Sequence, residues 1–255
     1  MQLVLRLLTV RSVVDVGCGD GSWLRVFSKC GIEDVLGLDG EYLDRDILQI
    51  HADRFQAADL RKPLVLGRVF DLAMSLEVAE HLPPECAPTF VESLTRLAPA
   101  VLFSAAIPFQ RGDNHINEQW PDKWAGLFRE RDYVAIDCIR RRVWQDDSVD
   151  WWYSQNTLLF AKRSLLDHNQ ELRVEFERTD LNSLSLVHPK QYLYLHEHYV
   201  QAEARAQQPA ALPSGTIEAS RILLVCLGNA ITSRLRWLVE YGRRPKQKPS
   251  ISELQ

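Results

Sequence analysis

Three glycines at alternate positions follow a β-branched segment close to the start of the chain. Residues 12–21 read Ser-Val-Val-Asp-Val-Gly-Cys-Gly-Asp-Gly. Glycine at positions 17, 19 and 21 lets the backbone turn tightly and approach a ligand more closely than any Cβ permits. Asp15, two residues before the first of them, disfavours a pyrophosphate and favours a cationic or hydroxyl-rich ligand. The segment therefore predicts a strand, a ligand-binding turn and a helix.

Two further acids each end a short apolar segment. Asp39 closes the run Val-Leu-Gly-Leu at 35–38, and Asp59 closes Phe-Gln-Ala-Ala at 55–58. An acid after the second strand of a doubly wound fold can accept hydrogen bonds from both hydroxyls of a ribose. The spacing therefore predicts three acids at three consecutive strand ends.

These segments resemble the class I S-adenosylmethionine-dependent methyltransferases over roughly residues 10–163. The resemblance implies that the glycine loop passes under the methionine part of the cofactor, that Asp39 binds the ribose and that Asp59 contacts the adenine. A nicotinamide-binding fold would place its third glycine one residue later, where this chain has Ser22. The cofactor-binding residues implied by the resemblance are Asp15, Gly17, Gly19, Gly21, Asp39, Gly40, Asp59, Leu60 and Leu76.

Apolar segments and helical segments alternate along this region, a pattern typical of an α/β fold with a parallel sheet and helices on both faces. The family has seven strands, with the last one antiparallel, so we expect a Rossmann-like, mostly parallel sheet. Helices are expected at 83–97 and 124–130. Strands are expected at 12–16, 35–38, 54–58, 70–75, 101–106, 133–139 and 157–162.

The character of the sequence changes after about residue 163. We expect a methyltransferase domain over 1–163, a helical C-terminal extension over 164–242 and a disordered basic tail over 243–255. The extension predicts helices at 189–206 and 216–241. Apolar residues recur at helical spacing in the second, so one face needs a partner: the core, a second copy or another enzyme.

Candidate catalytic residues follow the fourth expected strand. Glu77, Glu80 and His81 form a Glu-x-x-Glu-His pattern, and His115 lies in the polar loop after the next strand. Oxygen and nitrogen ligands of this kind suit Mg²⁺ or Mn²⁺. The pattern resembles that of metal-dependent O-methyltransferases of small-RNA 3′ ends and of ubiquinone biosynthesis.

That resemblance implies a divalent ion bound by Glu77, Glu80, His81 and His115, which lowers the pKa of an acceptor hydroxyl. Two alternatives stay open. His81 acts as a general base without metal, with Glu80 and His115 as further catalytic residues, or the motif has a structural role.

An aromatic pattern indicates the kind of acceptor. Residues 115–128 and 152–160 resemble a subgroup of bacterial methyltransferases found with polysaccharide-assembly enzymes. Aromatic rings suit stacking against sugar faces, although tryptophans before a helix also seal the edges of cores. The residues in question are Trp120, Trp124, Trp151, Trp152 and Tyr153.

Composition disfavours several classes of protein. A net charge of −4 and a pI near 6.0 provide no basic field for nucleic acid, and Arg140, Arg141 and Arg142 are soon followed by acids. Five cysteines without a Cys-x-x-Cys pair favour reduced thiols in the cytoplasm. Arg6 interrupts the first apolar run, and no run is long enough to span a membrane, so neither a signal peptide nor a membrane span is expected.

The sequence therefore predicts a cytoplasmic S-adenosylmethionine-dependent O-methyltransferase whose acceptor is a sugar or glycan precursor. Two alternatives remain: a small-molecule O- or N-methyltransferase of secondary metabolism, and a non-catalytic partner subunit with the same fold.

Overall fold

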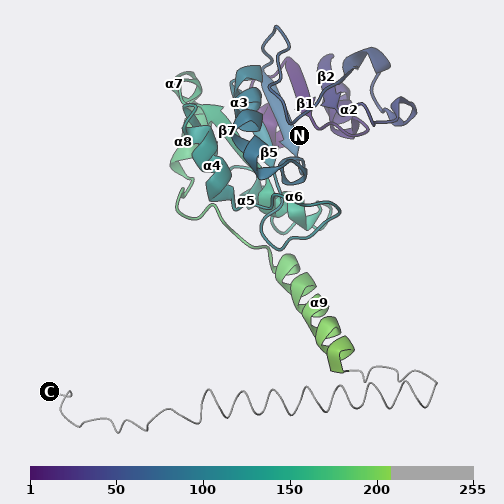
Figure 1. Ribbon diagram of the computed structural model, residues 1–255. Helices are drawn as coiled ribbons and strands as arrows, with labels where there is room; N and C mark the ends of the chain where they lie inside the picture. The colour runs from purple at the N-terminus through teal and green to yellow at the C-terminus, as the bar shows by residue number, and fades with distance from the viewer. Residues whose placement is uncertain (208–255) are drawn as a thin grey trace, which may run out of the picture. The chain divides into compact units, whose positions relative to one another are not determined.

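The computed structural model describes residues 1–207, and the chain divides into two compact units, Met1–Tyr199 and Val200–Gln255. Figure 1 shows the order of the elements along the chain. The strands are β1 (Ser12–Val16), β2 (Asp34–Asp39), β3 (Phe55–Ala57), β4 (Leu72–Leu76), β5 (Ala100–Ser104), β6 (Tyr133–Ile136) and β7 (Leu158–Lys162). The α-helices are α1 (Gln2–Leu7), α2 (Ser22–Lys29), α3 (Ala87–Leu97), α4 (Pro121–Arg129), α5 (Arg140–Val143), α6 (Trp151–Asn156), α7 (Leu165–His168), α8 (Gln170–Glu177) and α9 (Pro189–Gln207). Short 3₁₀ turns are η1 (Arg45–Ile47), η2 (Ala52–Arg54), η3 (Ala79–His81) and η4 (Pro84–Cys86).

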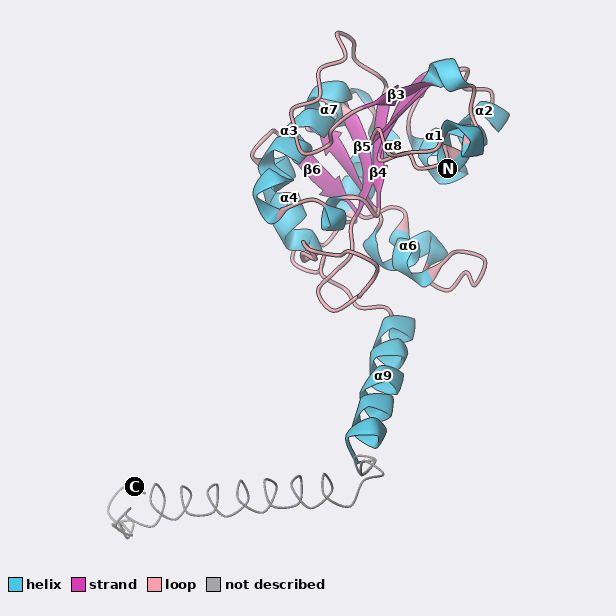
Figure 2. Cartoon of the chain, turned by 45° about the vertical axis from the view of Figure 1, so that its right-hand side comes forward, coloured by secondary structure: helices cyan, strands magenta, loops and turns pink. Residues whose placement is uncertain are grey.

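All seven described strands form one sheet in the order β3-β2-β1-β4-β5-β7-β6. Figure 2 draws the strands in magenta, with helices around them in cyan. Neighbours from β3 to β5 pair in parallel, whereas β7 is antiparallel to both β5 and β6. The predicted mostly parallel sheet with an antiparallel last strand is confirmed. Because the chain order reverses between β1 and β4, the carboxyl ends of these strands open a crevice there.

Successive residues of the central strands point to opposite faces of the sheet, so each strand supplies two cores. In β7, for example, Phe160 lies in a core with α3 and α4, and Leu159 lies in a core with α2 and α8. Both side chains are fully buried. The expected Rossmann-like arrangement, with helices on both faces, is therefore present.

Some element ends differ from the sequence expectation. The strand expected over 101–106 ends at Ser104, because the backbone N–H of Ala106 turns away to donate to Glu80 Oε1 at 3.2 Å. The strand expected over 133–139 ends at Ile136, where the N–H of Asp137 donates to Thr179 Oγ1 instead. The helix expected over 83–97 is a 3₁₀ turn followed by α3, and the helix expected at 124 begins at Pro121.

Beyond the sheet, α7 packs against β7 and α8 against β6, within the first unit. The helix expected over 189–206 is present as α9. The helix expected over 216–241 and the tail expected over 243–255 lie outside the described residues. Among the described helices, none combines the length and the apolar character needed to cross a membrane.

Candidate active site

A cleft of about 910 Å³ lies at the carboxyl ends of β1 to β4; we refer to it as the larger cleft. It brings together most of the residues that the sequence predicted for a cofactor. Six of the nine line it: Gly17, Gly19, Asp39, Gly40, Asp59 and Leu60. Val78 and Leu82 add apolar side chains to the same wall.

Asp39 ties the two loops of the larger cleft together. Its Oδ2 accepts the N–H of Gly19 at 2.8 Å, and its Oδ1 accepts the N–H of Gly40 at 2.6 Å and the hydroxyl of Tyr42 at 2.7 Å. A carboxylate accepts about four hydrogen bonds, so acceptor capacity remains for a ligand hydroxyl. Tyr42, which the sequence analysis did not single out, is therefore also part of the cleft.

Asp59 lines the larger cleft and is paired with Arg61. The Arg61 guanidinium donates to both of its oxygens, at 2.8 and 3.0 Å. Hydrogen bonding to this guanidinium holds the pKa of Asp59 well below its usual range. Asp59 is therefore a fixed anion at neutral pH.

Asp15, Gly21 and Leu76 lie outside the lining of the larger cleft. Asp15 is 1% exposed, and burial, followed by the nearby charge of Asp39, raises its pKa to about 8. Gly21 immediately precedes α2, in the left-handed region at φ 76°, with Ile50 packed where a Cβ would be. Their cofactor role stays a prediction, and the structure buries Asp15 within β1.

A second pocket of about 350 Å³ adjoins the larger cleft; we refer to it as the smaller pocket. Glu77 lines both cavities. The other residues around the smaller pocket are Glu80, Gln110, Arg111, His115, Trp151, Trp152 and Tyr194.

Glu77 is held in a conformation that a glutamate rarely adopts. Its φ of 55° lies in the left-handed region, which costs a non-glycine residue about 1–2 kcal/mol. Its carboxylate accepts hydrogen bonds from the amides of Gln110, at 3.0 Å, and Asn156, at 3.1 Å. Burial raises the pKa of Glu77 above its usual value. Because the surrounding structure supports a strained residue here, the position of this carboxyl group is well defined.

Glu80, His81 and His115 lie together, with one potential ligand atom from each within 4.8 Å of the others. The two imidazole rings meet edge to face, with their centroids 4.9 Å apart. One oxygen of Glu80 accepts the N–H of Ala106, and the other is buried without a hydrogen-bond partner. Burial and the charge of Glu77 raise the pKa of Glu80 to about 8, and burial lowers the pKa of His81.

The expected helical turn over Glu77, Glu80 and His81 is instead the short turn η3, and Glu77 precedes it. This separates the four expected metal ligands into a group of three and Glu77, whose carboxylate binds amides. An unpartnered buried carboxylate oxygen beside two imidazoles is a donor set that fits a divalent cation.

Glu118 organises the loop that carries His115, and the sequence analysis assigned it no role. Its carboxylate accepts the backbone N–H of Phe109 at 2.7 Å and of Arg111 at 2.8 Å, and lies 3.0 Å from His115 Nδ1. The only available signal was its position three residues after His115, within a polar segment.

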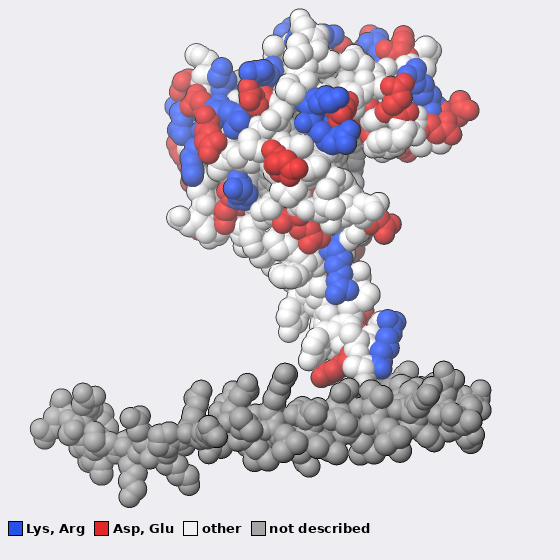
Figure 3. All heavy atoms as spheres, in the orientation of Figure 1, with Lys and Arg blue, Asp and Glu red and all other residues white. Residues whose placement is uncertain are grey.

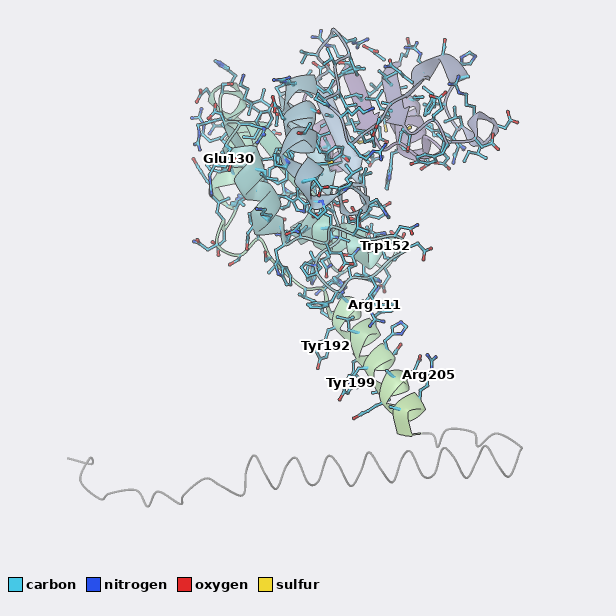
Figure 4. All side chains as sticks on the ribbon, in the orientation of Figure 1. Arg111, Glu130, Trp152, Tyr192, Tyr199 and Arg205 are labelled. Carbon is cyan, nitrogen blue, oxygen red and sulfur yellow. The ribbon has the colours of Figure 1, made fainter. Side chains whose placement is uncertain are left out.

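The aromatic residues divide between the smaller pocket and the core. Trp151 and Trp152 line the pocket as expected, and Tyr194 of α9 joins them (Figure 4 labels Trp152). Trp124 is 2% exposed and packs against Phe103, with ring centroids 5.2 Å apart, so its expected place at the rim is wrong. Trp120 and Tyr153 lie outside the pocket lining.

The arginines after β6 form ion pairs within the fold. Arg140 is 1% exposed and donates to both oxygens of Asp137, and Arg141 and Arg142 both donate to Glu175. These ion pairs hold the cluster against Asp137 and Glu175, and the expectation that it does not bind nucleic acid stays a prediction.

Known proteins share this fold and sequence pattern. A model of the methyltransferase-domain family matches residues 1–186. No curated protein matches the chain.

Solved structures similar to the chain include three methyltransferases. The methyltransferase domain of bacterial CtHen1-CN is 21% identical over 62% of this chain and 92% of that one, with a TM-score of 0.44. An O-methyltransferase family protein from Burkholderia thailandensis is 16% identical over 64% of this chain and 53% of that one, with a TM-score of 0.45. Magnesium protoporphyrin IX methyltransferase from Synechocystis PCC 6803, with bound SAH, is 17% identical over 62% of this chain and 77% of that one, with a TM-score of 0.41. The chain thus spans about half of the Burkholderia protein.

The sheet and its cleft define a Rossmann-like protein of the methyltransferase class. Because the family match covers residues 1–186 of 255, the chain belongs to the methyltransferase-domain family. It is an S-adenosylmethionine-dependent methyltransferase.

Proposed function

We propose that this methyltransferase transfers the methyl group of S-adenosylmethionine to a hydroxyl of a sugar or glycan precursor bound in the smaller pocket. The observation that carries this proposal is the position of Glu77 in the walls of both cavities. A methyl donor and its acceptor must meet where their two binding sites join. In the described part of the chain, the larger cleft and the smaller pocket join at Glu77. Tryptophan faces and hydrogen-bonding side chains around the smaller pocket suit a sugar.

The larger cleft fits S-adenosylmethionine. The Asp39 carboxylate retains capacity to accept ribose hydroxyls, and Val78 and Leu82 supply an apolar wall for the adenine. A Cβ on Gly19 would meet no atom within 4 Å, so this backbone borders open space in the cleft. The cofactor supplies a methyl group on a sulfonium, which is already electrophilic, so the protein must mainly align the acceptor and remove one proton.

We further propose that Mg²⁺ or Mn²⁺ binds Glu80, His81 and His115. The unpartnered oxygen of Glu80 supports a cation there. Such an ion would lower the pKa of an acceptor hydroxyl. Glu77, the fourth ligand expected from the sequence, is held by amides at the junction of the cavities, and we assign it to contact with the acceptor instead. Without a metal, His81 takes the role of general base, since burial lowers its pKa and favours the neutral ring.

Charge supports a neutral acceptor rather than RNA. On the face drawn in Figure 3, basic and acidic side chains of the described residues are interspersed. The described cysteines, Cys18, Cys30, Cys86 and Cys138, are free thiols, which supports a cytoplasmic enzyme.

The test is methyl transfer from labelled S-adenosylmethionine to a panel of monosaccharides, nucleotide sugars and oligosaccharides. We expect turnover by the wild type and loss of both turnover and cofactor binding in Asp39→Ala. Removal of the Asp39 acceptor for Gly19 and Gly40 loosens the loop and should cost at least tenfold in cofactor affinity by calorimetry. If the panel gives no product while small phenols or amines do, the enzyme belongs to secondary metabolism. Cofactor binding without turnover on any acceptor would favour a partner subunit.

The metal is tested on the same reaction. Prolonged EDTA should abolish turnover, and Mn²⁺ or Mg²⁺ should restore it. His81→Ala should lose this response, whereas His51→Ala, at an 83% exposed side chain, should keep it. Full activity after EDTA would remove the metal from the proposal and leave His81 as the base.

A further inference from the structure

Glu118 makes three contacts within one loop, and one of them is to His115 of the proposed metal site. The loop from Phe109 to Glu118 contains three non-glycine residues with left-handed backbones: Phe109 at φ 68°, Arg111 at 62° and Asn114 at 60°. Each such residue costs about 1–3 kcal/mol and persists only where neighbouring contacts support it. Glu118 accepts the N–H groups of the first two and so supplies that support.

The third contact determines the chemistry of His115. An ionised glutamate can only accept hydrogen bonds, so the 3.0 Å contact from His115 Nδ1 to Glu118 Oε1 requires the proton to lie on Nδ1. In a neutral ring, Nε2 then carries the lone pair. The side chains of His115 and Glu118 are 12% and 19% exposed, so water competes little for this hydrogen bond.

The His115 ring packs closely against Gly112 and occupies the space that a Cβ there would need. A Cβ at this position would lie 2.2 Å from His115 Nε2. Gly112 therefore allows the ring to lie where it does, and the contact of Nδ1 with Glu118 leaves Nε2 as the ring nitrogen without a carboxylate partner.

We propose that Glu118 is a positioning residue that holds His115 in the Nδ1–H tautomer and so presents Nε2 to the site formed with Glu80 and His81. This inference rests on the proposed function for its consequence, but the tautomer can be measured without any substrate. Carboxylates that orient a metal-binding histidine in this way typically change metal affinity ten- to a hundredfold when they are removed.

The experiment uses the full chain with Glu118→Ala and Glu118→Gln. Glu130→Ala is the matched control, since Glu130 is an exposed glutamate well away from Trp152 in Figure 4. Ring nitrogen shifts of His115 are measured by ¹⁵N NMR at one pH, and the affinities for Mn²⁺ and S-adenosylmethionine by calorimetry. If Glu118→Ala does not fold, Glu118→Gln decides, because it keeps the length and one acceptor oxygen but removes the charge.

We expect the wild type and Glu130→Ala to carry the proton on Nδ1. In Glu118→Ala, the proton of His115 should move toward Nε2, and Mn²⁺ should bind at least tenfold more weakly than to the wild type. Glu118→Gln should lie between the wild type and Glu118→Ala in both measurements. The affinity for S-adenosylmethionine should be the same in all four proteins. An unchanged His115 tautomer in both Glu118 variants would overturn the proposal. If the wild type binds no Mn²⁺, the metal part of the proposed function fails, and the tautomer alone still decides the role of Glu118.

Discussion

At the scale of single residues, three aspartates that the sequence presents as equivalent strand-end acids have different surroundings. Asp15 is buried with one oxygen unpartnered, Asp39 accepts two backbone N–H groups, and Asp59 is clamped by Arg61. Hydrogen bonding favours the charged form and burial disfavours it. Asp15 and Asp59 therefore affect stability over different pH ranges.

Asp15 gives the clearest prediction. Its pKa is raised from an ordinary value of 3.8 to about 8, so between these values the folded protein holds a proton that the unfolded chain has lost. The free energy of unfolding should therefore decrease as the pH rises from about 4 to about 8, by at most ~1.4 kcal/mol per pH unit for this proton. Asp15→Asn removes this contribution, so urea unfolding at several pH values should show the variant gaining on the wild type as the pH rises. Parallel pH profiles for the two proteins would contradict the assignment.

At the scale of elements, the glycine loop needs glycine for two reasons, a left-handed backbone and close approach to a ligand, and mutation can separate them. Gly19 and Gly31 both have left-handed backbones, at φ 51° and 91°, and a Cβ on either would meet no atom within 4 Å. Only Gly19 lines the larger cleft.

We therefore expect Gly19→Ala and Gly31→Ala to lose similar stability, about 1–2 kcal/mol each, in chemical unfolding. Only Gly19→Ala should also weaken S-adenosylmethionine binding, by at least tenfold, because its methyl group projects into the cofactor's space. Equal cofactor affinities in the two variants would show that the loop does not approach the ligand closely.

The start of α9 contributes to the smaller pocket, the proposed acceptor site. His188 and Gln191 are buried, and the Gln191 amide donates to the carbonyl of Phe109 at 3.0 Å. This anchorage places Tyr194 in the wall of the smaller pocket.

Tyr194→Ala should raise the KM for the acceptor several-fold, because an aromatic contact of about 1 kcal/mol is lost. Cofactor affinity should stay unchanged. Tyr192→Ala, at a 67% exposed neighbour labelled in Figure 4, should change neither value. Steady-state kinetics and calorimetry check both, and equal acceptor KM values for the two variants would remove Tyr194 from the site.

The sequence was sufficient for features that depend on local pattern. The strand before the glycine loop, the strands that end in acids and the alternation of strands and helices follow from pattern and spacing, and the resemblance to the family implied the six cofactor residues that line the larger cleft. The rest depends on contacts between distant positions. Asn156 reaches Glu77 across 79 positions, and Tyr194 lies beyond the segment with motifs. Trp124 belongs to a helix whose apolar face could be assigned to core or rim only once its neighbour Phe103 was known.

At the scale of the whole molecule, the unit Met1–Tyr199 is built from two cores that share one sheet. Leu24 of α2 lies in one core and Phe160 of β7 in the other, where its ring stacks on Phe128 at 3.9 Å between centroids. Because the same strands supply both cores, loss of packing on either face should destabilise the whole unit.

Leu24→Ala should cost about 2–5 kcal/mol and Phe160→Ala about 3–5 kcal/mol of unfolding free energy. Both should shift the same cooperative transition, followed by tryptophan fluorescence and by circular dichroism. Val65→Ala, at a 79% exposed side chain, should stay within about 0.5 kcal/mol of the wild type. Separate transitions in either core variant would mean that the two faces unfold independently.

Glu77 borders the larger cleft on one side and the smaller pocket on the other. A side chain shared in this way links the two occupancies thermodynamically, since a ligand that shifts the carboxyl group from one side changes the surface offered to the other. The coupling free energy must be reciprocal. With donor and acceptor in these cavities as proposed, the factor by which the donor changes the affinity for the acceptor equals the factor by which the acceptor changes the affinity for the donor, and Glu77 is the side chain placed to carry that coupling.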